Sequence, residues 1–197
     1  IKVIIPDSLN TIFETSLPEV ITIPLIEYNQ GSLSYKNSHE IIGEIQWADV
    51  VLFGPGLISK SSDWMAQVLK KIEIPLILDA SGFAPLIDKK CHISELPRKT
   101  ILTPHYAEFS RIFDIDIRKV TSDPISSVEG IISLLNGRVL VLKGPTNVIV
   151  TSKGRLFLMN NGTSALATAG TGDVLSGILA AIVAQGSSLD DAALLGP

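Results

Sequence analysis

The chain has 197 residues, of which 46% are hydrophobic and 18% are charged, and its formal net charge is −4. This length suits one folded core, and the apolar content excludes intrinsic disorder. The negative net charge argues against a nucleic-acid partner. For the same reason, any anionic ligand must be bound by a local site and not by the overall charge of the surface. The most apolar helical stretch, 174–184, is too short to cross a bilayer, which takes about 20 residues, so we expect no membrane association.

Short β-branched runs alternate with amphipathic segments along the chain. The runs that predict strands are Lys2–Ile5, Val20–Ile26, Asp49–Phe53, Pro75–Asp79, Lys99–Leu102, Val139–Lys143, Asn147–Thr151 and Arg155–Met159. The segments that predict helices are His39–Trp47, Ser62–Ile72, Tyr106–Phe113, Pro124–Leu135, Gly172–Gln185 and Leu189–Leu195. Several strand runs are continuously apolar, as in a parallel sheet that is covered on both faces. The alternation predicts an α/β fold, and a turn at Ser152–Gly154 predicts an antiparallel edge.

The sequence contains no internal repeat, low-complexity tract or linker rich in proline and glycine, so we expect a single domain over residues 1–197. It opens on Ile1 without a methionine and stops at Pro197, just after the start of an alanine-rich helix. We therefore expect a chain that is truncated at both ends. Cys91 is the only cysteine, so no disulfide can form within the chain, and a reduced, cytoplasmic setting is expected.

The sequence Ala169-Gly170-Thr171-Gly172-Asp173 comes directly before a helical run. Two glycines around a small residue let backbone N–H groups converge at a helix N-terminus, where the helix dipole also favours an anion. Asp173 could then take the proton of a hydroxyl that attacks a bound phosphorus. Alternatively, Asp173 serves only the helix end, since acids are common in first turns. A P-loop and a dinucleotide fingerprint are both excluded, because the lysine and the third glycine that they require are missing.

Three further loops follow predicted strands, which is where α/β proteins bind ligands. Thr103–Glu108 puts Glu108 about one helical turn from His105, although the same segment also suits an ordinary helix start. Lys143–Asn147 offers a lysine beside a glycine turn, and Phe53–Leu57 contains Gly-Pro-Gly, where a ring could approach the backbone. Each loop has a purely structural explanation when taken alone. Their convergence on one sheet edge is the argument for a site.

At these residues the sequence resembles the NAD(P)H-hydrate dehydratases, a carbohydrate-kinase-related family. The resemblance runs from about Asp49 to Leu195, and the stretch from Leu166 to Gly177 is close to diagnostic. It implies a ribokinase-like three-layer sandwich with a mostly parallel central sheet, helices on both faces and an antiparallel edge. It also implies a hydro-lyase that repairs hydrated NADH and NADPH. In this reaction ADP or ATP, with Mg²⁺, phosphorylates the ring hydroxyl, and phosphate then leaves as the double bond returns.

The resemblance implies a role for each matching residue. Asp173 matches the acidic residue that is catalytic in the family. The implied anion hole consists of Ala169, Gly170, Thr171 and Gly172. The implied adenine-nucleotide loop consists of Lys143, Gly144, Pro145, Thr146 and Asn147, and Gly172 lies beside the nucleotide. Substrate contacts are implied for Gly56, His105 and Asp173. Glu108 is expected to organise magnesium through water. The family often forms homotetramers, so we expect a homo-oligomer.

The sequence departs from the family at Asp79–Phe83, which reads Asp-Ala-Ser-Gly-Phe where Asp-Ala-Asp-Gly-Leu is usual, and at Asn147, where threonine is common. One alternative is a small-molecule kinase of the same fold, of thiazole or pyridoxal type. These kinases tend to have asparagine in place of His105, which favours the dehydratase. Another alternative is a non-catalytic nucleotide-binding fragment, against which the intact Asp173 argues. The sequence does not choose between ADP and ATP or between the two hydrated cofactors, and it does not tell whether an epimerase domain is fused to the chain.

Overall fold

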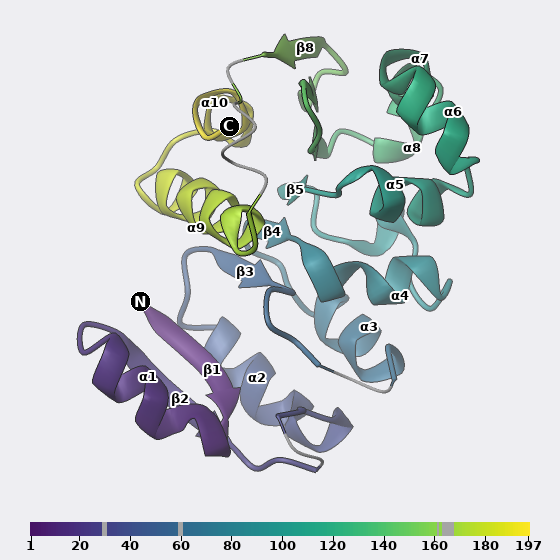
Figure 1. Ribbon diagram of the computed structural model, residues 1–197. Helices are drawn as coiled ribbons and strands as arrows, with labels where there is room; N and C mark the ends of the chain where they lie inside the picture. Colours follow the sequence, from purple (N-terminus) through teal and green to yellow (C-terminus); the bar gives the residue numbers. More distant parts are fainter. Residues whose placement is uncertain (29–30, 59–60, 161, 163–167) are drawn as a thin grey trace.

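The computed structural model describes residues 1–28, 31–58, 61–160, 162 and 168–197. A central sheet runs through this part of the chain in the strand order β3-β4-β5-β6-β7-β8 (Figure 1). Its strands are β3 (Val51–Phe53), β4 (Leu76–Leu78), β5 (Thr100–Leu102), β6 (Val139–Leu142), β7 (Asn147–Val150) and β8 (Leu156–Met159). Strands β3 to β6 are parallel, whereas β7 and β8 are antiparallel to their neighbours. The expected sheet with its antiparallel edge is confirmed.

Alternate residues of the central strands face opposite layers. Leu76 and Leu78 of β4 pack into one hydrophobic core, and Ile77 between them packs into the other. The same alternation separates Leu102 from Ile101 in β5. All of these side chains are fully buried. Burial on both faces explains why these strands read as continuous apolar runs instead of alternating ones.

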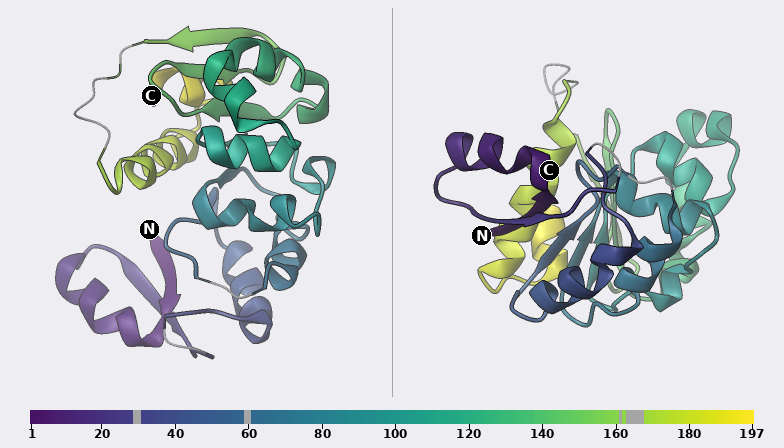
Figure 2. Two further views of the ribbon diagram at one scale, coloured as in Figure 1. Left: turned by 45° about the vertical axis from the view of Figure 1, so that its right-hand side comes forward. Right: turned by 90° about the horizontal axis from the view of Figure 1, so that it is seen from below.

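Helices cover both faces of the sheet, as expected for a three-layer sandwich (Figure 2). One layer contains α2 (Ser38–Ile45), α3 (Asp63–Leu69), α4 (Ala84–Ile87), α5 (Tyr106–Phe113), α6 (Ile117–Ser122), α7 (Pro124–Glu129) and α8 (Ile132–Leu135). The other contains α9 (Thr171–Ala184) and α10 (Leu189–Leu195). Short 3₁₀ helices are η1 (Asp7–Leu9), η2 (Tyr35–Asn37), η3 (Ala80–Phe83) and η4 (Ile93–Glu95). No helix in the described ranges combines the length and apolar character that a bilayer crossing needs.

The first two strands form a small sheet of their own. Strand β1 (Lys2–Pro6) pairs in parallel with β2 (Ile21–Leu25), and η1 and α1 (Asn10–Ser16) connect them. Both strands agree with the sequence prediction, but their separation from the central sheet was not predicted, because strand patterns do not specify the pairing partner. Helix α1 was also missed. None of its residues is buried, so it carries no apolar stripe to signal a helix.

One predicted helix is wrong in its extent. The segment Pro124–Leu135 forms two helices, α7 and α8, because the first ends at Glu129, directly before Gly130, and the second begins only at Ile132. Glycine is a weak helix former, and the helical periodicity continues across such a break. The short helices α4 and α6 were not predicted, since four to six residues give too little periodicity to recognise.

Candidate active site

Helix α9 begins with an open glycine turn. Gly170 directly precedes the helix with φ of 88°, a left-handed value that suits glycine, and no side chain of the described residues caps this end of the helix. Ala169 and Gly170 are exposed, and a Cβ at Gly170 would meet nothing within 4 Å. The first N–H groups of any helix lack an intrahelical acceptor. An anion can therefore reach those of Gly172 and Asp173.

Two threonines hold this turn in shape. The Thr171 hydroxyl donates to the carbonyl of Thr168 over 3.0 Å, and the Thr171 N–H points at the same oxygen over 3.4 Å. Asp173 then lies in the first turn of α9 and is exposed to solvent. A reachable carboxylate thus stands one residue after Gly172, whose N–H lacks an intrahelical acceptor, which is the arrangement that the catalytic prediction requires.

The ammonium group of Lys143 lies against the same turn. Its Nζ is 2.7 Å from Oδ1 of Asp79. A Cβ built on Gly172 would stand 3.2 Å from that Nζ, so only glycine leaves the lysine room without a shift. The Lys143 side chain is 20% exposed, whereas that of Asp79 is 1% exposed. A fixed positive charge therefore flanks the N-terminal amides of α9, on the side of the sheet where β6 ends.

The predicted nucleotide loop, 143–147, is braced from two sides. The N–H of Gly144 donates to Oδ1 of Asn147 over 3.2 Å, which closes the turn. Tyr106 lies so near that a Cβ at Gly144 would stand 2.4 Å from the phenol oxygen. Burial raises the pKa of Tyr106, so this phenol stays neutral at physiological pH. Gly144 and Pro145 themselves are exposed, so the outer side of the loop can be contacted by a ligand.

His105 caps helix α5 and lies beside this loop. Its Nδ1 accepts hydrogen bonds from the N–H groups of Ala107 and Glu108, at 3.1 and 3.3 Å. A parallel β-bridge joins His105 to Lys143, and the Lys143 N–H donates to the carbonyl of Pro104 over 2.8 Å. The segment does begin a helix, but its cap is His105 and its first residue is Tyr106. The His105 side chain is 56% exposed and remains accessible next to Lys143.

Glu108 does not offer a free carboxylate for a metal. Its Oε2 accepts from the His105 N–H over 2.9 Å, its Oε1 lies 3.5 Å from His105 Nε2, and its side chain is 15% exposed. Within the described ranges, no three side chains of His, Cys, Asp or Glu come together as a ligand set. The described residues therefore offer no set of three such side chains for a magnesium ion. Magnesium is commonly bound through substrate phosphates and water, and this mode remains open.

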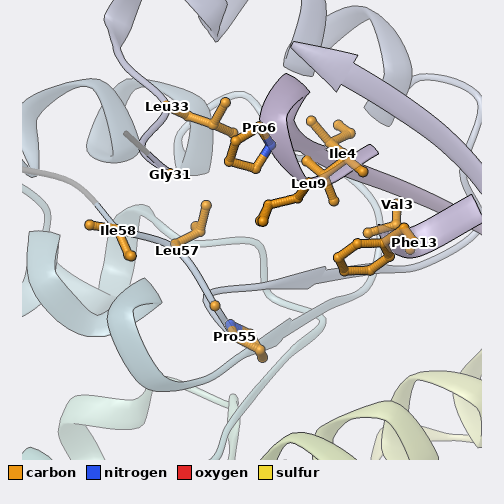
Figure 3. Close-up of a pocket in the computed structure, with 12 residues that line it drawn as sticks. Val3, Ile4, Pro6, Leu9, Phe13, Gly31, Leu33, Pro55, Leu57 and Ile58 are labelled. Atoms are coloured by element: carbon orange, nitrogen blue, oxygen red, sulfur yellow. The ribbon is translucent and has the colours of Figure 1, made fainter. Parts of the chain in front are cut away.

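The loop after β3 approaches the loop after β4 backbone to backbone. Gly54 has φ of 128°, and a Cβ there would stand 1.7 Å from the carbonyl oxygen of Asp79. Two residues further on, Gly56 is exposed at a hollow between β1 and this loop. The hollow is lined mainly by apolar side chains, with Ile4, Pro6, Phe13, Leu33, Pro55 and Leu57 among them (Figure 3).

Hydrogen bonds and close approaches thus connect the loops after β3, β4, β5 and β6 with the start of α9. The links run from Gly54 to Asp79, from Asp79 to Lys143, and from Lys143 to Gly172 and Pro104. Gly56 lies outside this set of contacts, at the apolar hollow. The motif residues 165–167 lie outside the described residues. The sequence did not single out Asp79 as the centre of the contacts, although a carboxylate that ends a buried strand was a usable signal.

The overall fold is that of the ribokinase-like proteins. A ribokinase-like superfamily protein from Enterococcus faecalis superposes with a TM-score of 0.79 at 24% identity, covering 98% of this chain and 65% of that one. The ADP/ATP-dependent NAD(P)H-hydrate dehydratase of Bacillus subtilis, co-crystallised with ATP and Mg²⁺, gives a TM-score of 0.73 at 24% identity. That match covers 96% of this chain and 63% of that chain.

The sequence comparisons place the chain within one family of this fold. The model of the NAD(P)H-hydrate dehydratase family matches residues 1–196. The ADP-dependent (S)-NAD(P)H-hydrate dehydratase of Natrialba magadii is 31% identical over 198 residues, covering 100% of this chain and 68% of that protein. The chain belongs to the NAD(P)H-hydrate dehydratase family. It spans 29 to 37% of the length of the bifunctional NAD(P)H-hydrate repair enzymes that it also matches.

Proposed function

We propose that this protein uses an adenine nucleotide to dehydrate hydrated NADH or NADPH. The observation that carries the proposal is the open start of α9, where the exposed carboxylate of Asp173 directly follows Gly172 and the Lys143 ammonium lies against the same glycine. A nucleotide-driven dehydration needs an anion site, a base beside it and a positive charge for the migrating phosphoryl group. The names of the relatives from N. magadii and B. subtilis support the same activity.

In the proposed reaction, the amides of Gly172 and Asp173 and the Lys143 ammonium bind the phosphates of ADP or ATP. Asp173 takes the proton of the substrate's ring hydroxyl as its oxygen attacks the terminal phosphorus. A new bond forms between that oxygen and phosphorus, and AMP or ADP departs. Phosphate then leaves with the electron pair of the carbon–oxygen bond, a proton leaves the adjacent ring carbon, and the double bond is restored. Hydroxide is a poor leaving group, which is why the phosphoryl group is used.

The remaining site residues fit this reaction as follows. The loop 143–147, with Tyr106 behind it, would contact the adenine nucleotide. Gly56 and His105 would contact the hydrated cofactor, for which the apolar hollow beside Gly56 offers a neighbouring surface. Mg²⁺ would enter with the nucleotide's phosphates, and Glu108 would reach it only through water, since its carboxylate already serves the helix cap.

The direct test is to mix the purified protein with hydrated NADH and either ADP or ATP, and to follow absorbance at 340 nm. We expect absorbance to recover in the presence of a nucleotide and to stay flat without one. Phosphorylation of a thiazole or pyridoxal-type alcohol without any recovery would instead make the protein a kinase. Nucleotide binding with neither reaction would make it a non-catalytic binding domain.

Two expectations from the sequence remain predictions. The family resemblance favours a homo-oligomer, which light scattering on the purified protein would test. The single cysteine favours a reduced, cytoplasmic setting, which localisation in cells would test.

A further inference from the structure

Asp79 is a buried carboxylate at the end of β4, and both of its oxygens are engaged. Oδ1 accepts from the Lys143 ammonium over 2.7 Å and from the N–H of Ala80 over 2.8 Å. Oδ2 accepts from the Ser176 hydroxyl over 2.5 Å. Ser176 belongs to α9, so one carboxylate ties the lysine of the nucleotide loop to the helix that carries Asp173.

We propose that Asp79 is a positioning residue, which holds the Lys143 ammonium over the first turn of α9 so that the lysine meets the phosphate chain of the nucleotide. This inference rests on the proposed function, in which that turn binds the phosphates. Asp79 does not touch the reacting atoms. With three donors on two oxygens and 1% of its surface exposed, it is neither a base nor a metal ligand.

Electrostatics explains why Lys143 needs a negatively charged partner at this position. The N-terminus of a helix carries a partial positive charge, which repels an ammonium group placed beside it. A Cβ built on Gly172, in the first turn of α9, would nevertheless stand only 3.2 Å from Lys143 Nζ. The negative charge of Asp79 offsets this repulsion and fixes the direction of the lysine. Since an ammonium group has three N–H donors, Lys143 can keep its bond to Asp79 and still donate to a phosphate.

Two features position Asp79: an uncommon backbone conformation directly after it, and backbone contacts with the loop after β3. Ala80, directly after it, has φ of 48°, a left-handed value that is rare for a residue with a side chain. The Asp79 N–H donates to the carbonyl of Phe53 over 3.1 Å, and Gly54 lies against the Asp79 carbonyl. The carboxylate is therefore placed by two loops and has little freedom to follow a mobile lysine.

The test is a double-mutant cycle, with inorganic pyrophosphate as the ligand and titration calorimetry as the readout. The variants are Asp79→Asn, Lys143→Met and their combination. Asparagine preserves the shape but lacks the charge. Its one oxygen can still accept from the Ala80 N–H, and its NH₂ group can donate to the Ser176 hydroxyl oxygen. We expect Asp79→Asn to weaken pyrophosphate binding about tenfold, the size of one charge-assisted hydrogen bond. In the Lys143→Met background the same change should have almost no effect, because Asp79 acts through the lysine.

Matched controls separate this role from a general loss of stability. Lys70 and Glu95 form an ion pair with the same 2.7 Å separation, between the end of α3 and η4. Glu95→Gln should leave pyrophosphate binding unchanged. Ser176→Ala removes the hydrogen bond from the Ser176 hydroxyl to Asp79. It should weaken pyrophosphate binding two- to threefold, again only when Lys143 is present. Ser176→Ala with and without Lys143→Met decides the question if Asp79→Asn does not fold.

The inference is overturned if wild-type protein binds no pyrophosphate, if Asp79→Asn binds it as tightly as wild type, or if the loss is equally large without Lys143. The proposed function fails by a different result. Suppose that the effect of Asp79→Asn on pyrophosphate binding depends on Lys143, but the protein never restores absorbance at 340 nm. The Asp79–Lys143 anion site is then supported, and the proposed dehydratase activity is refuted.

Discussion

Replacing Gly54 by alanine tests how the loops of the site are spaced. The new Cβ would stand 1.7 Å from the carbonyl oxygen of Asp79 and 2.6 Å from the N–H nitrogen of Gly82. Both are backbone atoms, so no flexible side chain can move aside. The φ of 128° is also unsuited to alanine. Backbone strain of about 1–3 kcal/mol adds to an overlap worth about 1–3 kcal/mol, so we expect a loss of roughly 4 kcal/mol.

The assay is thermal unfolding of Gly54→Ala beside Gly56→Ala. For a chain of this length, 1 kcal/mol corresponds to about 2–4 °C, so Gly54→Ala should lower Tm by roughly 8–16 °C. Gly56 also has a left-handed φ, 69°, but a Cβ there would meet nothing within 4 Å. Gly56→Ala should therefore lose only about 1 kcal/mol, the strain alone. Equal losses from the two variants would refute the reasoning that backbone contact sets the spacing of these loops.

Three further predictions concern parts of the fold away from the reaction. Arg138 is 2% exposed and donates to backbone carbonyls, that of Pro97 among them, so Arg138→Met should lower the free energy of unfolding in urea by about 3 kcal/mol. Burial raises the pKa of Cys91 to about 11, so a thiol reagent at pH 8 should label it only after denaturation; rapid labelling of native protein would contradict this. Lys70 holds the pKa of Glu95 below its ordinary value near 4.5, so this carboxylate stabilises the fold above that pH and loses its contribution as the pH falls further. Lys70→Met should therefore flatten the dependence of stability on pH below about 4.5.

The strands and longer helices were predictable from the sequence because they are built from local patterns. Continuous apolar runs such as that of β4 reflect burial on both faces of the sheet, and the prediction for α5 gives its observed bounds. The break at Gly130 and the separate sheet of β1 and β2 were not predictable. The helical periodicity of the sequence continues across the break at Gly130, and a strand pattern does not specify which strand is the pairing partner.

The site was predictable in its parts but not in its connections. The loops after β3, β5 and β6 and the glycine turn before α9 were recognised, since such loops have a local signature. The central position of Asp79 was not recognised, because its partners Lys143 and Ser176 lie 64 and 97 residues away in the sequence. Tyr106 was missed as the support of the nucleotide loop for the same reason. Contacts of this kind follow from the order of strands in the sheet, which places the ends of β4, β5 and β6 side by side.

The role of Asp173 is the central claim, and the substitution Asp173→Asn tests it most directly. The variant keeps the glycine turn and the Lys143 ammonium, so its affinity for ADP, measured by calorimetry, should stay within about twofold of wild type. Its rate of absorbance recovery at 340 nm with hydrated NADH and ADP should fall at least about 100-fold, since the hydroxyl loses its proton acceptor. Near-normal turnover in the variant would contradict the account.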